Sequence, residues 1–271
     1  MPEFPQVPEQ DASPEIAAIY RDIRAVSGLP VVNLIWRHFA ALPGVLPWAW
    51  TGVRPLIGSA ALDAARGRVA SELRLPEIAP PGSAAWLRAG VSDQDLRRIE
   101  AINAAYIRGN LTNALALTAL RLRLQHPERP GAELPPGNPH GEPPPHLEKL
   151  PRMGDLAPGL AARIHDLADR HAIEGGVMPS LYLAFSPWPG LIEALPSLLA
   201  PLYEPAVLLA TRASTCRLVE AEACGILPAP GKPPVGVAAM QPGLELFTRV
   251  VIPDLLAVGL AVRRLLATTT P

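Results

Sequence analysis

The chain has 271 residues, enough to bury a substantial core as one domain or as two fused halves of ordinary size. Its 24 basic and 25 acidic residues leave a formal net charge of −1. Such a balance provides no basic field for a phosphate backbone, so nucleic acid is excluded as an expected partner. The hydrophobic share of 49% favours a well-packed globular protein over a disordered one.

Neither the amino terminus nor the apolar stretches indicate export or membrane insertion. The first residues lack the charged and apolar regions of a signal peptide. The stretches 198–210 and 255–262 are interrupted or ended by proline and charged residues, short of the roughly 18 apolar residues of a membrane span. We therefore expect a soluble, cytoplasmic protein without a membrane partner. Cys216 and Cys224 form no CxxC motif, so we expect two reduced, structural thiols.

A degenerate internal repeat organises the chain. The segment 28–48 returns in altered form at 176–191, where Trp188-Pro189-Gly190-Leu191 corresponds to Leu42-Pro43-Gly44-Val45. A similar predicted helix precedes each copy. The chain is therefore predicted to consist of two versions of one unit.

A proline-rich stretch separates these two versions. Residues 126–151 contain runs such as Glu142-Pro143-Pro144-Pro145, which are typical of a semi-rigid, extended linker. The predicted organisation is a first helical repeat over 1–125, the linker over 126–151, and a second helical repeat over 152–271.

The first predicted helix shows how the helical pattern arises. Ser13-Pro14-Glu15 is a helix start, Ile16 to Ile23 carry apolar residues at three- and four-residue spacing, and Gly28 ends the pattern. No stretch alternates as a half-buried strand does. The expected fold class is all-α, with two fused helical repeats packed as a pseudo-dimer. Further helices are predicted over 31–41, 47–57, 60–75, from Ser92 onward, 160–171, after Gly190, over 205–225 and over 243–268.

The helix that begins at Ser92 carries polar residues where a buried stripe is expected. Asn103, Tyr106, Asn110 and Asn113 share one face if the helix is continuous. Buried amides and phenols cost free energy unless they form hydrogen bonds, so a binding pocket would explain them. The alternative is that Gly109-Asn110 breaks the helix and Asn110 caps the next one.

Other polar groups point weakly to chemistry. His165 and Asp169 stand four residues apart with His171 and Glu174 nearby, but a solvated helix face explains them better than a metal site. Neither a metal nor a cofactor is expected.

Three arginines are plausible partners for a carboxylate, because the guanidinium fork matches its geometry. They are Arg37, Arg54 and Arg249, although surface charge is the ordinary role of arginine. His38 is better explained as a structural histidine than as a pocket residue.

Five segments together resemble the group I 2-haloacid dehalogenases, and the resemblance extends over nearly the whole chain. They are Tyr20–Arg24, Leu29–Trp50, Ala89–Asp93, Tyr106–Asn110 and Pro187–Pro189. Each half is more remotely similar to the alkylhydroperoxidase D type of helical unit, without its CxxC. The resemblance implies a cofactor-independent, all-α protein of two fused repeats. It also implies release of halide from D- and L-2-haloacids by a water that an Asp activates, without a covalent ester.

The resemblance assigns residues to a pocket between the repeats but departs from the family at the general base. Asn110 matches the asparagine that positions the water, whereas the family's Ser-Asp pair falls on Ser180 and Leu181. Apolar Val31 and Leu34 replace larger rings, and Phe247 stands where a tyrosine is expected. The predicted pocket residues are Val31, Leu34, Tyr106, Ser180, Leu181 and Phe247.

Three functions follow as hypotheses. The first is a pocket for a small carboxylic acid or apolar ligand with lost or changed activity, because a leucine cannot accept a proton from water. The second is an active 2-haloacid dehalogenase that uses another carboxylate, such as Asp254. The third is a structural or interaction protein with a filled core. A small molecule is the expected partner, a homodimer is possible, and Leu181→Asp is predicted to gain activity.

Overall fold

The computed structural model describes residues 5–29, 31–132, 134, 150–173, 177–229 and 231–267, and within these ranges every regular element is helical. The predicted all-α fold class is therefore confirmed. The main helices are α1 (Pro14–Ser27), α2 (Leu34–Ala40), α3 (Val45–Ile57), α4 (Ala60–Glu72), α5 (Ser83–Arg88), α6 (Asp93–Gln125), α7 (Pro158–Asp169), α8 (Ser180–Ala184), α9 (Pro189–Leu198), α10 (Ala200–Tyr203), α11 (Pro205–Ala223), α12 (Val237–Leu246) and α13 (Ile252–Leu266), with short turns η1 (Glu9–Asp11), η2 (Met153–Asp155) and η3 (Phe247–Val251).

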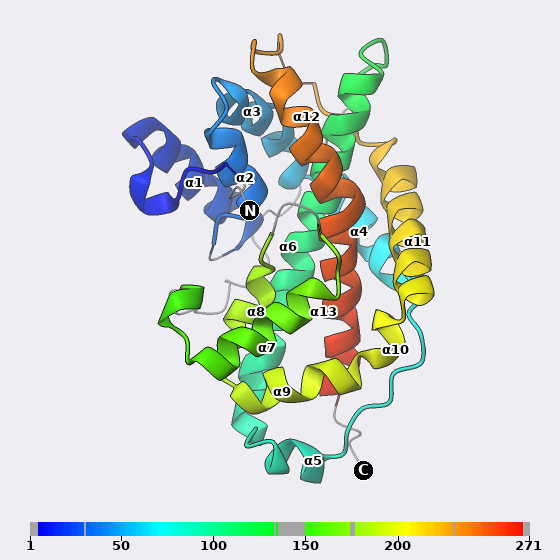
Figure 1. Cartoon of the computed structure of the whole chain (residues 1–271). Helices are drawn as coiled ribbons and strands as arrows, with labels where there is room; N and C mark the ends of the chain where they lie inside the picture. Colours follow the sequence, from blue (N-terminus) through cyan, green and yellow to red (C-terminus); the bar gives the residue numbers. More distant parts are fainter. Residues whose placement is uncertain are drawn as a thin grey trace.

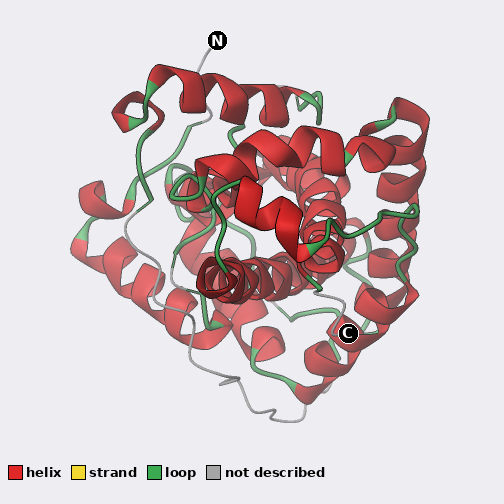
Figure 2. Ribbon diagram, turned by 90° about the horizontal axis from the view of Figure 1, so that it is seen from below, coloured by secondary structure: helices red, strands yellow, loops and turns green. Residues whose placement is uncertain are grey.

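The helices α6 and α13 form the centre of the molecule, where they lie side by side (Figure 1). Helices α4 and α11 both pack against α6, and α3 covers another part of it. The view turned by 90° in Figure 2 shows the remaining helices surrounding this centre. Among the described helices, none is long and apolar enough to cross a membrane.

The helix α1 forms as its sequence predicts. The Ser13 hydroxyl accepts a hydrogen bond from the Ile16 backbone nitrogen at 3.3 Å, as an N-cap does. At the other end Gly28 adopts a φ of 64°, the left-handed conformation that glycine tolerates best.

The helix α6 runs unbroken for 33 residues, so Gly109-Asn110 does not interrupt it. Its start is the predicted capping box, in which Ser92 and Asp95 satisfy each other's backbone nitrogens. Gly109 serves packing instead, because a Cβ atom there would lie 2.7 Å from the methyl groups of Leu29. Continuity of α6 places Asn103, Tyr106, Asn110 and Asn113 on a shared, buried side.

The hydrophobic core consists of two clusters, and each draws residues from both sides of the proline-rich stretch. One cluster joins Trp36 and Trp50 to Leu256, and the other joins Trp86 and Ile99 to residues of α8 and α9. The two halves therefore share their cores. The repeat boundaries and the pseudo-dimer stay predictions, and most of the predicted linker, 135–149, lies outside the described residues.

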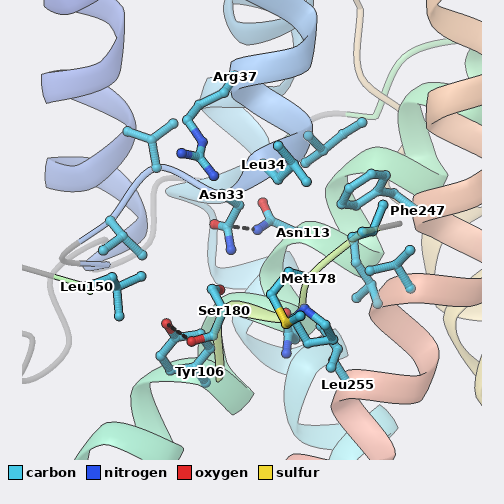
Figure 3. Close-up of a pocket in the computed structure, with 18 of the residues that line it drawn as sticks. Asn33, Leu34, Arg37, Tyr106, Asn113, Leu150, Met178, Ser180, Phe247 and Leu255 are labelled. Atoms are coloured by element: carbon cyan, nitrogen blue, oxygen red, sulfur yellow. Dashed lines mark hydrogen bonds between the residues drawn. The ribbon is translucent and has the colours of Figure 1, made fainter. Parts of the chain in front are cut away.

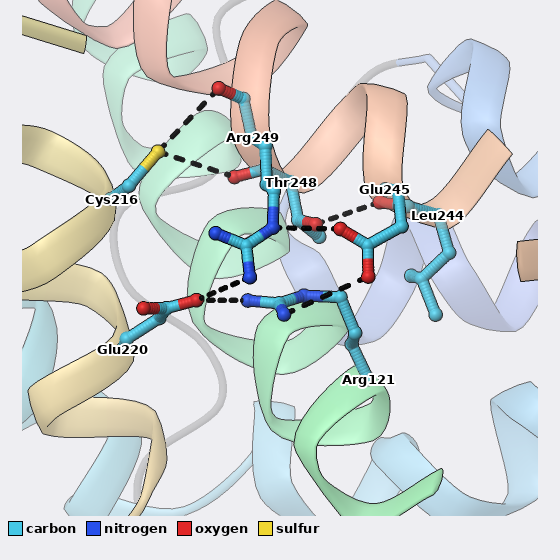
Figure 4. A network of polar contacts seen from close by, with 7 residues as sticks. All are labelled: Arg121, Cys216, Glu220, Leu244, Glu245, Thr248 and Arg249. Atoms are coloured by element: carbon cyan, nitrogen blue, oxygen red, sulfur yellow. Dashed lines mark hydrogen bonds and ion pairs between the residues drawn. The ribbon is translucent and has the colours of Figure 1, made fainter. Parts of the chain in front are cut away.

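The last predicted helix is interrupted by the π-turn η3. Pro253 has no N–H, so the Arg249 carbonyl four residues earlier cannot receive its usual helical hydrogen bond. The Cys216 thiol, 3.5 Å from that oxygen, donates to it instead, as Figure 4 shows. Both cysteines are free thiols. Because Phe247 and Val251 belong to η3, the π-turn determines how this part of the chain faces the interior.

Candidate functional site

A cavity of about 550 Å³ lies between α2, the middle of α6, the start of α8 and the η3–α13 segment (Figure 3). It is lined by Glu9, Gln10, Val31, Val32, Asn33, Leu34, Ile35, Arg37, Tyr106, Asn110, Asn113, Leu150, Val177, Met178, Pro179, Ser180, Phe247, Val251, Ile252 and Leu255. The wall is thus mostly apolar with a few polar groups, the usual composition of a small-molecule site.

A directed chain of hydrogen bonds fixes two of the cavity's amides. The Trp36 indole nitrogen donates to Asn113 Oδ1 at 3.0 Å, and Asn113 Nδ2 donates to Asn33 Oδ1 at 2.9 Å. Because an indole N–H can only donate, it determines which way both amides are turned. Asn33 stands at the N-cap of α2, yet its side chain forms no capping bond. Its amide nitrogen is left to face the cavity.

Tyr106 and Asn110 approach the cavity from α6. The Tyr106 hydroxyl donates to the Ser180 carbonyl at 3.2 Å, and burial raises the pKa of Tyr106 to about 12. The Asn110 amide nitrogen is buried and has no hydrogen-bond partner within the described residues. Tyr106 therefore connects α6 to α8 as a neutral phenol, whereas the Asn110 amide remains available to a ligand or a water.

Two charged side chains complete the wall. Glu9 forms an ion pair with Arg24, and its other oxygen accepts a hydrogen bond from the Val32 backbone nitrogen at 3.1 Å. Burial lowers the pKa of the Arg37 guanidinium, and the negative charge of Glu9 partly opposes that effect. Glu9 is the single carboxylate among the described residues of the wall. Nothing in the sequence around Glu9 marked it as a candidate.

The structure brings most of the residues of the predicted pocket to this cavity. Val31, Leu34, Tyr106, Asn110, Ser180 and Phe247 all line it, and Leu181 does not. The Leu181 side chain is fully buried in the cluster around Trp86, because successive residues of α8 point in different directions. The side chain that α8 turns toward the cavity is Ser180.

Asp254 does not reach the cavity. Its carboxylate accepts two hydrogen bonds from Arg212, both at 2.8 Å, and lies 3.2 Å from His171 Nδ1. The other ring nitrogen of His171 lies 2.7 Å from the Tyr182 hydroxyl. Asp254 is thus enclosed in its own buried cluster, which removes it as the replacement base.

The remaining sequence candidates lie elsewhere. Arg54 pairs with Asp22 at 2.6 Å, Arg249 pairs with Glu245 at 2.7 Å, and His38 contacts the Pro5 carbonyl at 2.8 Å. Of the four residues considered as a metal site from the sequence, His171 is buried in the interior and Glu174 lies outside the described residues. Among the residues that the structure describes, no group of three or more His, Cys, Asp or Glu side chains is placed to hold a metal ion.

The structure is an all-α protein with an internal cavity, and solved structures share this fold. A D-2-haloacid dehalogenase mutant superposes with a TM-score of 0.79 at 20% identity, and a D-2-haloacid dehalogenase in complex with L-LA with 0.78 at 18%. Each comparison covers 97% of this chain and 96% of the other.

A sequence relative agrees with the fold. The chain is 29% identical over 215 residues to a configuration-inverting 2-haloacid dehalogenase of Alcaligenes xylosoxydans xylosoxydans. The aligned region covers 73% of this chain and 69% of the relative. No protein-family profile matches. The resemblance to 2-haloacid dehalogenases predicted from the sequence is confirmed, and the chain is a homologue of these enzymes.

Proposed function

We propose that this dehalogenase homologue binds a small carboxylic acid with an apolar remainder, and that the hydrolytic reaction of its relatives is lost or changed. One observation carries the proposal. The resemblance assigns the general base to position 181, and the Leu181 side chain found there is buried outside the cavity.

The chemistry of the wall supports lost or changed catalysis. Activation of a water requires a group that accepts a proton near neutral pH. The Asn110 amide can hold a water or a ligand by hydrogen bonds but cannot take its proton. Tyr106 stays protonated because burial raises its pKa to about 12. Neither side chain replaces the missing carboxylate.

The cavity argues against a filled core. A volume of about 550 Å³ is in the range of small-molecule sites. A purely structural protein would be expected to fill such a space with apolar side chains, because unfilled volume costs packing energy. Ligand binding therefore explains the cavity better than a structural or interaction role does.

A second candidate function is retained because Glu9 lies in the wall. Among the described residues of the cavity wall, Glu9 has the one carboxylate that could accept a proton from a water. One of the Glu9 oxygens is paired with Arg24 and the other accepts a hydrogen bond from the Val32 backbone nitrogen, so both are already engaged within the protein. An active dehalogenase would then depend on Glu9 and not on Asp254.

The test offers purified protein D- and L-2-chloropropionate and bromoacetate, and measures both binding heat and free halide. Saturable binding without halide release is the expected result. The variants are Glu9→Gln and Asn110→Ala, with Glu15→Gln as a control because Glu15 is exposed on α1. Halide release that disappears in Glu9→Gln alone would establish the second candidate. A protein that neither binds nor hydrolyses these acids would contradict both.

A further inference from the structure

The Arg37 guanidinium is exceptional among the arginines that line or border the cavity. Its Nε atom is buried without a hydrogen-bond partner, and within the described residues no ion pair joins its guanidinium to a carboxylate. Arg24 nearby is paired with Glu9. A desolvated guanidinium without a partner costs free energy. A ligand with a negative charge would compensate the positive charge of such a group in a cavity wall.

The same side of the cavity has more hydrogen-bond donors than acceptors. The Asn33 amide nitrogen is presented because Trp36 and Asn113 fix the direction of that amide. Figure 3 shows Arg37 above Asn33, with Asn113 beside Asn33 and hydrogen-bonded to it. The acceptor that could neutralise them, Glu9, is already engaged by Arg24 and by the Val32 backbone.

Another part of the cavity wall is apolar. Phe247 and Leu255 come from the η3–α13 segment, and Met178 precedes α8 (Figure 3). A ligand with one anionic end and one hydrophobic end therefore has a single favourable orientation in this cavity. A carboxylate fits the donor side because a guanidinium can donate two parallel hydrogen bonds to its oxygens.

We infer that Arg37, assisted by the amide of Asn33, binds the carboxylate of the ligand and makes the cavity selective for monocarboxylic acids over their neutral amides. The inference rests on the proposed function and names the group that performs the recognition. Arg37 positions the ligand and takes no part in bond cleavage. The apolar remainder of the acid points toward Phe247 and Leu255.

The experiment compares propionate with propionamide by isothermal titration calorimetry. These two ligands have nearly the same shape and differ in charge. We expect the wild type to bind propionate at least about 10-fold more tightly, because charge-assisted hydrogen bonds exceed neutral ones. In Arg37→Gln the affinity for propionate falls by about 10- to 100-fold, whereas that for propionamide changes less than about 2-fold. Arg37→Lys, which keeps the charge but loses the fork, is expected to lie between them.

The control is Arg21→Gln, since Arg21 is exposed on α1 and outside the cavity wall. It should bind both ligands as the wild type does. Thermal melting checks folding: Arg37→Gln should melt at or above the wild-type temperature, because an unpaired, partly buried charge is removed. Equal propionate affinity in the wild type and in Arg37→Gln would overturn this inference and leave the proposed function standing. Failure of the wild type to bind propionate, 2-chloropropionate and bromoacetate would overturn both.

Discussion

At the scale of single residues, Ser180 and Leu181 are neighbours with different surroundings. Ser180 lines the cavity, whereas the Leu181 side chain is fully enclosed in the hydrophobic cluster around Trp86. The sequence resemblance alone assigned the missing base to Leu181. Of these two neighbours, Ser180 is the one that lines the cavity, so we expect a carboxylate at position 180, and not at 181, to reach a ligand.

Leu181→Asp is therefore predicted to lose stability without gaining activity. An unpaired carboxylate in an apolar core should lower the free energy of unfolding by about 3 kcal/mol or more. Ser180→Asp should fold, because position 180 faces the cavity, and should release halide from 2-chloropropionate above the wild-type level. Urea unfolding and halide release measure the two effects. A stable, active Leu181→Asp protein beside an inactive Ser180→Asp protein would refute this assignment.

Asp254→Asn separates structural from catalytic importance. The Asp254 carboxylate compensates the charge of Arg212, so its loss should destabilise the fold by about 3 kcal/mol. Ligand affinity should not change, because Asp254 does not line the cavity. Denaturant titration and calorimetry with propionate are the measurements. Unchanged stability combined with weaker binding would contradict the assignment.

At the scale of elements, a polar network fixes the η3 turn against its neighbours. The Arg121 side chain of α6, only 4% exposed, pairs with Glu220 of α11 and lies 3.8 Å from Glu245 of α12 (Figure 4). Arg249 of η3 contacts the same two glutamates at 3.2 and 2.7 Å. Because η3 supplies Phe247 to the cavity, this network links the stability of the turn to the shape of the site.

Arg121→Met should lower the free energy of unfolding by about 1–3 kcal/mol, since two glutamates lose a buried partner. Arg68→Met is the matched control, because Arg68 pairs with Glu222 on the surface and such pairs contribute little. Urea unfolding compares the two variants with the wild type. Equal stabilities would show that the network does not hold the turn.

At the scale of the whole molecule, all four tyrosines are shielded from water. Burial raises the pKa of Tyr20, Tyr106 and Tyr203 to about 12 and that of Tyr182 well above its ordinary value. In the unfolded chain a tyrosine ionises near pH 10. The contribution of these tyrosines to stability is thus complete below pH 10 and is lost as the pH rises toward 12.

Ultraviolet absorbance of tyrosinate checks that sign. We expect almost no tyrosinate between pH 9 and about 11, followed by one cooperative rise that coincides with loss of helical circular dichroism. Gradual ionisation near pH 10 in a protein that keeps its helices would contradict the burial of these side chains.

Much of the fold was accessible from the sequence, because caps and apolar spacing are local signals. Ser13 and the Ser92–Asp95 box start helices as predicted, and the all-α class is confirmed. Long-range packing explains the failures. Gly109 was a possible helix breaker, but it lies within a continuous α6 where the Leu29 side chain packs closely against it. The π-turn depends on Pro253 and on Cys216 together, and these lie far apart in sequence.

The candidate site was less predictable. The polar stripe of α6 indicated Tyr106 and Asn110 because its spacing is local. Glu9 carries no such signal, since the tertiary fold alone brings its segment to the cavity. Arg37 was one of three equivalent arginines until the structure paired Arg54 and Arg249 elsewhere.

The most direct test is calorimetry of the wild type with D- and L-2-chloropropionate, with chloride measured in the same samples. The proposed function predicts saturable binding of at least one enantiomer and no chloride above the protein-free control. Chloride released in proportion to protein and time would contradict the loss of the dehalogenase reaction. Absence of binding heat for both enantiomers at several temperatures would contradict the cavity as a carboxylic acid site.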